Sequence, residues 1–163
     1  MDKESEQMND IFEFQLRKGK VGEDVIENLM KRRGHEVICV ASQQEFFNDD
    51  IDFLIDGIKC ELKTDYRISK TGNLFLESEM YYFSDGRKEK GYFYKTKADY
   101  LFYYDINNDI LLIYKMSALK EYINDSTHIC NTREVDDGYK IVTGYVIPYN
   151  CIPHQKINVK EAS

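Results

Sequence analysis

The dipeptide Asp56-Gly57 constrains the fold more than any other feature of the chain. It separates two short, mostly apolar runs, residues 51–55 and 58–64. An Asp-Gly pair between two such runs is a strong signal for a β-hairpin with a two-residue turn. With Asp56 and Gly57 at the centre of the turn, Ile55 lies opposite Ile58, and this pairing sets the register of both strands.

Counting back from the turn separates the side chains of the hairpin into two faces. One face carries apolar pairs, Phe53 with Cys60 and Ile51 with Leu62. The other face carries polar pairs, Asp52 with Glu61 and Asp50 with Lys63. Because successive side chains of a strand point to opposite faces, Asp52, Glu61 and Lys63 are predicted to share one face.

Two carboxylates directly opposite each other repel and lower stability. A divalent cation between them turns that repulsion into coordination, and Mg²⁺ needs only one or two carboxylates besides waters and a substrate phosphate. Lys63 follows two residues after Glu61, close enough to orient or polarise a water at the metal. The alternative is a solvent-facing strand with mixed charges, since the pattern Asp…Glu-x-Lys is common. The hairpin pairing and a preceding helix that carries Glu23 favour a site.

Apolar residues at steps of three and four predict a first helix over residues 9–33, with Gly22 as a point where it bends or is interrupted. Gly34 is a typical helix stop. The sequence then predicts a strand over 36–41, a loop over 42–49, the hairpin, a strand over 73–80, an exposed turn over 84–91, paired strands over 98–104 and 110–115, a short helix over 117–123 and a strand over 139–147.

This order, αβββ followed by further strands and a helix, predicts an α/β (α+β) domain with a mixed central β-sheet and flanking helices. The 163 residues fit a single domain, 1–163, that can bury a sizeable core. We expect residues 1–8 to be a flexible N-terminus and residues 155–163 a flexible tail.

The formal net charge of −7 counts against nucleic-acid binding, because neutralising phosphates requires Lys and Arg. A metal site, however, needs clustered carboxylates, and local basic patches can exist within an acidic chain. No stretch approaches the roughly 18 apolar residues of a membrane-spanning helix, and the charged N-terminus lacks the apolar run of a signal peptide. We therefore expect a cytoplasmic protein without a membrane partner, in the host cytoplasm if it is viral.

The four cysteines are scattered and form no C-x-x-C pair, so in a reducing compartment they are interpreted as buried small apolar residues. One alternative is a zinc site built from His128, Cys130, Cys151 and His154. Their spacing is not that of a common zinc module.

The residues around the hairpin resemble the PD-(D/E)xK nuclease superfamily, which has the restriction-endonuclease-like fold. The resemblance covers roughly residues 20–80 and lies in three segments: Glu23 in Gly-Glu-x-x-Ile-x-x-Leu-Met, Asp52 in Asp-Ile-Asp-Phe-Leu-Ile, and Glu61-Leu62-Lys63. The residue before Asp52 is Ile51 and not the Pro of the motif, a frequent departure. The usual helix between the third and fourth core strands is not evident in residues 81–97.

The resemblance implies phosphodiester hydrolysis by four catalytic residues, Glu23, Asp52, Glu61 and Lys63. Asp52 and Glu61, with the Leu62 carbonyl, would hold Mg²⁺ or Mn²⁺, and Lys63 would position a water and offset negative charge. Glu23 would act on the metal through water or on a second metal; its alternative is a solvated helix residue. Glu77 is either a further acidic member or an exposed strand residue.

Candidate nucleic-acid contacts follow the catalytic strand at Arg67, Lys70 and Asn73 and recur at Lys95 and Lys97. The last two belong to a basic-aromatic stretch with Tyr92, Phe93 and Tyr94 that could stack on splayed bases. The alternative for this stretch is a charged hairpin with core aromatics.

The first functional hypothesis is a metal-dependent endonuclease acting on nucleic acid, with DNA as the expected substrate. The second is a catalytically inactive protein of the same fold that binds or inhibits a protein partner, which the net acidity favours. A dimeric junction-resolving enzyme is a variant of the first hypothesis, because one small protomer of a homodimer would cut one strand.

Overall fold

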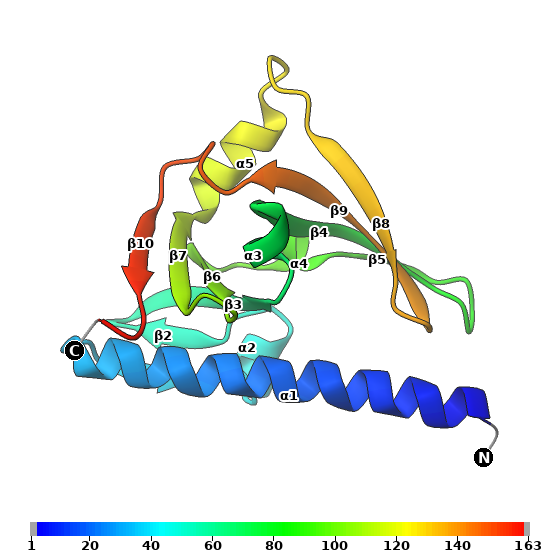
Figure 1. Ribbon diagram of the computed structural model, residues 1–163, viewed down its shortest axis with the longest axis horizontal. Coiled ribbons are helices and arrows are strands. Elements are labelled where there is room, and N and C mark those ends of the chain that lie inside the picture. The colour runs from blue at the N-terminus through cyan, green and yellow to red at the C-terminus, as the bar shows by residue number, and fades with distance from the viewer. Residues whose placement is uncertain (1–2, 162–163) are drawn as a thin grey trace.

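The computed structural model describes residues 3–161, which form one long helix lying beneath two β-sheets (Figure 1). Helix α1 (Lys3–Arg32) is continuous, and residues 3–8, expected to be flexible, are part of it. Residues 1–2 and 162–163 lie outside the described residues. The C-terminal half of α1 buries Ile26, Leu29 and Met30 against the first sheet. The apolar residues whose spacing predicted this half of the helix are thus the ones that pack against the sheet.

The first sheet has six strands in the order β1-β2-β3-β6-β7-β10. The strands are β1 (Val37–Cys39), β2 (Phe53–Ile55), β3 (Ile58–Asp65), β6 (Tyr100–Asp105), β7 (Ile110–Lys115) and β10 (Gln155–Asn158). Strands β3 and β6 pair in parallel and all other neighbours are antiparallel. The predicted mixed α+β fold, with a mixed sheet and flanking helices, is confirmed.

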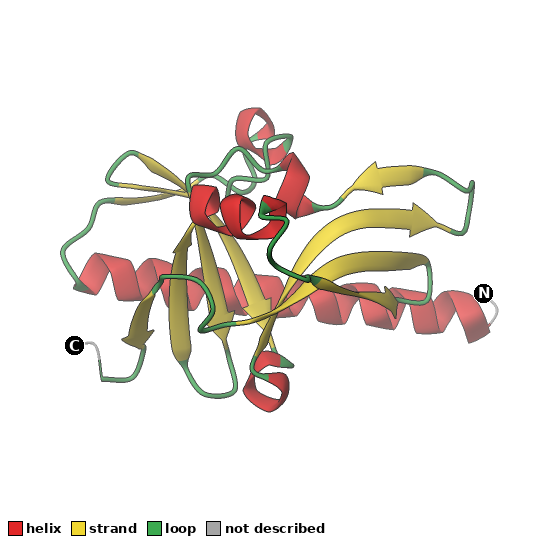
Figure 2. Ribbon diagram, turned by 90° about the horizontal axis from the view of Figure 1, so that it is seen from above, coloured by secondary structure: helices red, strands yellow, loops and turns green. Residues whose placement is uncertain are grey.

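The second sheet has four antiparallel strands in the order β5-β4-β9-β8, beside the first sheet and over the N-terminal half of α1 (Figure 2). The strands are β4 (Asn73–Tyr82), β5 (Lys88–Lys90), β8 (Asn131–Asp136) and β9 (Lys140–Pro148). Short helices α2 (Gln44–Phe47), α3 (Ile68–Thr71), α4 (Tyr92–Lys95) and α5 (Met116–Asn124) connect the strands.

Several predicted segments differ from the structure. The loop predicted over 42–49 contains α2, and the turn over 84–91 contains β5. The tail expected to be flexible from residue 155 contains β10, which pairs with β7. Val159, just after this strand, is buried in the core that faces α1. The connection from β3 to its parallel neighbour β6 carries the short helix α3, the strands β4 and β5, and the short helix α4.

Strand β3 separates two hydrophobic cores. Its residues Cys60 and Leu62 belong to the core between the sheet and α1. The second core lies on the opposite face of the sheet, where Leu101, Tyr103 and Tyr114 pack with residues of β4, α4 and α5. Because side chains alternate along β3, Glu61 and Lys63 point away from the first core, towards β4 and α4.

Gly22 does not bend α1, contrary to the expectation from the sequence, but permits its close approach to β3. A Cβ atom at this position would lie 1.8 Å from Thr64 Oγ1 and 3.1 Å from Thr64 Cβ. The Thr64 hydroxyl is itself buried without a hydrogen-bond partner among the described residues. The missing side chain therefore brings the next residue of the helix, Glu23, close to the sheet.

We predict that Gly22→Ala lowers the free energy of unfolding by about 1–3 kcal/mol, the range for overpacking a filled site. In an open helical position the same change stabilises by about 1 kcal/mol, because alanine has the higher helix propensity. Gly19, three residues away on α1, supplies the matched control, Gly19→Ala, because a Cβ atom added there would meet no atom within 4 Å. Urea unfolding followed by circular dichroism measures both.

The variant Thr64→Ala tests the cause of this loss. It removes the hydroxyl and the methyl group that the new Cβ would meet, so the double variant Gly22→Ala/Thr64→Ala should recover most of the lost stability. Strictly additive effects of the two substitutions would show that the contact is not the reason.

Candidate active site

The turn at Asp56-Gly57 has the geometry that the sequence predicts. Both residues have positive φ, 51° and 77°, as a type I′ hairpin requires. The pairing is Phe53 with Cys60 and Ile55 with Ile58, so the predicted register is confirmed next to the turn. Strand β2 begins at Phe53, so the predicted pairs that involve residues 50–52 are not part of the ladder. The turn is also tied to the end of α1, because the Asp56 carboxylate lies 2.6 Å from His35 Nδ1.

Asp52 lies at the point where β2 begins and is fixed by β3 through two hydrogen bonds. Its backbone N–H donates to the Cys60 carbonyl at 2.9 Å, and its Oδ2 accepts the Leu62 N–H at 2.7 Å. Burial raises the pKa of the Asp52 carboxyl, although the Lys63 ammonium and the Leu62 N–H oppose the shift. The side chain is thus held over β3 on the face that Glu61 shares.

Glu61 is a buried carboxyl with 3% relative exposure. Its Oε1 lies 2.9 Å from Lys63 Nζ, while its Oε2 has no hydrogen-bond partner among the described residues. Burial, together with the nearby charge of Asp52, raises its pKa to about 8 in spite of Lys63. An unpartnered buried carboxylate oxygen is costly unless a cation or a proton occupies it.

Lys63 is held between a carboxylate and an aromatic ring. Its Nζ contacts Glu61 on one side and lies 4.2 Å from the centroid of the Tyr92 ring on the other. Burial lowers the pKa of Lys63, but the carboxylates of Glu61, Glu77 and Asp52 outweigh it and the net pKa is raised. The ammonium therefore stays charged through the neutral range.

A cleft with a volume of about 410 Å³ contains all four predicted catalytic residues: Glu23, Asp52, Glu61 and Lys63. Glu23 enters it from α1, and its pKa is raised by burial and by the charge of Asp52. Asp50 and Glu77 also line the cleft. The presence of Asp50 near Lys63 could have been anticipated, because the predicted hairpin register placed Asp50 opposite Lys63. Glu77, left open between a site residue and an exposed one, is half-buried here.

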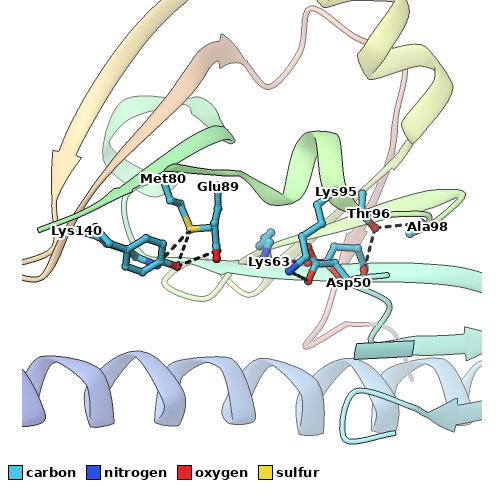
Figure 3. A network of polar contacts seen from close by, with 10 residues as sticks. Asp50, Lys63, Met80, Glu89, Lys95, Thr96, Ala98 and Lys140 are labelled. Atoms are coloured by element: carbon cyan, nitrogen blue, oxygen red, sulfur yellow. Dashed lines mark hydrogen bonds and ion pairs between the residues drawn. The ribbon is translucent and has the colours of Figure 1, made fainter. Parts of the chain in front are cut away.

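The predicted nucleic-acid contacts fall into two groups. Arg67 and Asn73 line a second cavity beside the cleft, whereas Lys70 is exposed and lines neither cavity. Figure 3 shows Lys95 directed towards Asp50, with Lys63 close by; the charged atoms of Lys95 and Asp50 are 3.7 Å apart. Lys97 is 3.1 Å from Asp49, so both Lys95 and Lys97 already have acidic partners.

The interpretation of residues 92–94 as a base-stacking stretch is wrong for two of its three aromatics. Tyr92 and Phe93 are 4% and 1% exposed, because α4 packs on β4 as part of the second core. The Tyr92 hydroxyl donates to the Phe75 carbonyl at 3.1 Å. Its contact with Lys63 gives Tyr92 a place at the site that the sequence pattern did not indicate.

The residues fit a single divalent ion with oxygen ligands better than a protein-only metal cage. Residues 3–161 contain no cluster of three or more His, Cys, Asp or Glu side chains arranged as metal ligands. Mg²⁺ does not need one, since it keeps several waters and uses one or two carboxylates. Asp52 and the free oxygen of Glu61 offer that donor set.

The four side chains considered for zinc do not form such a cluster either. His128 stacks on Tyr122 with ring centroids 4.0 Å apart, and His154 Nδ1 lies 2.8 Å from the Ile152 carbonyl. Cys151 is exposed and Cys130 is half-buried. Their local contacts are those of ordinary surface and loop residues.

No protein-family model matches the chain, and no curated protein matches it. Among solved structures, the chain is similar to a bacterial homing endonuclease, I-Ssp6803I, with a TM-score of 0.49 and 15% sequence identity. The similarity covers 76% of this chain and 86% of that chain. This similarity is too low to assign a chemistry to the site, which has to be argued from the residues of this chain.

None of the described helices has the length and apolar character needed to cross a membrane.

The raised pKa of Glu61 predicts how stability depends on pH in a chelator. The pKa is about 8 in the folded state against 4.5 for an unperturbed glutamate, so between these values the folded state binds more protons than the unfolded state. Stability should therefore fall as the pH rises from about 5 to 8. Glu61→Gln should remove much of this fall and stabilise the protein at pH 8, on the order of 2 kcal/mol.

Urea unfolding of both proteins at a series of pH values measures this. Glu121→Gln, at an exposed position of α5, is the control and should keep the wild-type slope. A Glu61→Gln protein that is less stable than wild type at pH 8 would mean that Glu61 is a structural partner of Lys63 and not an electrostatic liability.

Proposed function

We propose that the chain is a divalent-metal-dependent nuclease that hydrolyses phosphodiester bonds of nucleic acid, with DNA as the expected substrate. One observation carries this proposal: the buried carboxylate of Glu61 has an unpartnered oxygen in the same cleft as Asp52 and Lys63. We further propose that the chain is a divergent PD-(D/E)xK nuclease, since the Asp and the Glu-x-Lys of that motif occupy one cleft.

Asp52 and Glu61 are the residues that would hold Mg²⁺ or Mn²⁺, with the Leu62 carbonyl as the expected third oxygen and Glu23 acting through water. When bound, such an ion neutralises charge on a phosphate and lowers the pKa of a water molecule. Oxygen donors of this kind suit Mg²⁺ and Mn²⁺ better than softer metals. Burial raises the pKa of both carboxyls, and for Glu61 the charge of Asp52 adds to the shift.

Lys63 contributes a permanent positive charge. Because its pKa is raised, it is not suited to removing a proton from water at neutral pH. Its contacts with Glu61 and Tyr92 fix the ammonium before any substrate arrives. A fixed charge that needs no rearrangement is effective in stabilising negative charge that develops on a phosphate.

Cleavage assays test the proposal. Wild-type protein with Mg²⁺ or Mn²⁺ is expected to cut at least one member of a labelled panel of single-stranded DNA, duplex, flap, four-way junction and RNA. Glu61→Gln and Lys63→Ala should lower the rate by about 100-fold or more, as expected for loss of preorganised charge. Lys120→Ala on α5, outside both cavities, is the control and should keep full activity.

Circular dichroism confirms that each variant is folded. A fully active Lys63→Ala protein would contradict the proposed role of that residue. If wild-type protein cuts no substrate with either metal, the nuclease proposal fails and the binding or inhibitor protein becomes the better hypothesis.

Metal binding can be measured without activity. Mn²⁺ should raise the melting temperature of the wild-type protein at pH 8, because a ligand that binds only the folded state stabilises it. Glu61→Gln should lose this shift, and Glu121→Gln should keep it. Equal shifts in all three proteins would place the metal elsewhere.

A further inference from the structure

A second cavity of about 290 Å³ lies next to the catalytic cleft. The two share lining residues from three elements, including Lys18 of α1, Lys63 of β3 and Glu77 of β4. The second cavity continues from there between α1 and the four-stranded sheet, as far as Arg133 of β8. Cleft and cavity therefore form one groove, which we call the α1 groove.

The charge of the α1 groove changes along its length. Around Glu61, five carboxylates accompany only two lysines. In the second cavity, four cationic side chains accompany three carboxylates. The groove thus runs from a region suited to a metal ion to one that tolerates a phosphate.

Three of the four cationic side chains in the second cavity form no ion pair among the described side chains. Lys18, Arg67 and Arg133 have no acidic partner within 4.0 Å among the side chains that the structure describes, although Asp65 and Asp137 line the same cavity. Burial lowers the pKa of Lys18, and nearby Asp65 only partly offsets this. Lys18 is half-buried, whereas Arg67 and Arg133 are exposed, and all three line the same cavity. Cations that three separate segments bring to one cavity form charge-assisted contacts with an anion that enters it.

Aromatic rings lie among these cations. Phe14 of α1 is 56% exposed, and its ring centroid is 6.0 Å from that of Tyr66 at an interplanar angle of 31°. The Lys18 Nζ lies 5.7 Å from the Tyr66 ring, and the Arg133 guanidinium lies 5.7 Å from the Phe75 ring. Exposed rings combined with cations are typical of surfaces that bind unpaired nucleotides, where bases stack and phosphates meet the charges.

We propose that the α1 groove binds a single-stranded segment of the substrate beside the cleavage site. Lys18, Arg67 and Arg133 contact its phosphates, and Phe14 and Tyr66 stack on a base. The volume, near the lower end of the roughly 300–1,000 Å³ of small-ligand pockets, suits one unpaired nucleotide and not a duplex. This inference rests on the proposed nuclease function for the substrate class but uses different residues.

Fluorescence anisotropy with a short labelled single-stranded DNA, in EDTA and low salt, tests the inference without cleavage. Lys18→Gln, Arg67→Gln and Arg133→Gln should each weaken binding several-fold and lower the salt dependence by about one counterion. Phe14→Ala should weaken it about tenfold, within the range for loss of base stacking. Arg17→Gln, next to Lys18 on α1 but outside the groove and paired with Glu13, is the control.

The expected result is a loss of affinity in the four groove variants, wild-type affinity in the control, and weaker binding of a duplex of the same sequence. Unchanged single-strand binding in the groove variants, with normal circular dichroism, would overturn the inference, as would a duplex that binds tighter than the single strand. This binding assay does not depend on cleavage. If the groove variants lose binding but the protein cuts no substrate, the proposed nuclease function fails and the binding role of the α1 groove stands. If the protein cuts its substrate but the groove variants bind normally, the nuclease function stands and the binding role of the groove fails.

Discussion

The pairing of β2 with β3 around Asp56-Gly57 sets which side chains of β3 face the candidate active-site cleft. It places Leu62 in the core between the first sheet and α1 and turns its neighbours Glu61 and Lys63 to the opposite face. A register slip of one residue would exchange these two sets, burying charges in the core and exposing apolar side chains. The same apolar packing that stabilises the hairpin therefore also specifies the geometry of the site.

Burial and the charge of Asp52 disfavour the ionised form of Glu61, and the protein compensates this cost only in part. Lys63 satisfies one carboxylate oxygen, and the Tyr92 ring holds that lysine in place. The other oxygen remains without a partner in the described chain, close to the charge of Asp52. A protein optimised only for stability would replace such a carboxyl, and the proposed role of Glu61 as a metal ligand accounts for its presence.

The parts of the site that depend on a local turn and on alternation along one strand could be predicted from the sequence. The turn chemistry of Asp56-Gly57 and the two-residue alternation of β3 were enough to predict the register and the shared face of Glu61 and Lys63. The pairing of the strands predicted over 98–104 and 110–115 is also confirmed, in β6 and β7. Strand β8 was missed because it is an exposed edge strand without apolar alternation. Contacts between segments that are distant in the sequence could not be predicted from local sequence patterns. Nothing in the sequence distinguishes Tyr92, which meets Lys63, from the exposed Tyr94 two residues later.

Helix α1 joins two regions of very different local stability. Its C-terminal half is anchored by Ile26 and Leu29, which are fully buried, whereas no residue between 9 and 21 is buried. Local opening of a helix requires little free energy where few apolar contacts hold it. The floor of the α1 groove is therefore the part of the helix that frays first, while the Glu23 end stays formed. A ligand in the groove holds this segment in its helical form, so hydrogen exchange at residues 9–18 should slow when the groove is occupied, even when no bond is cut.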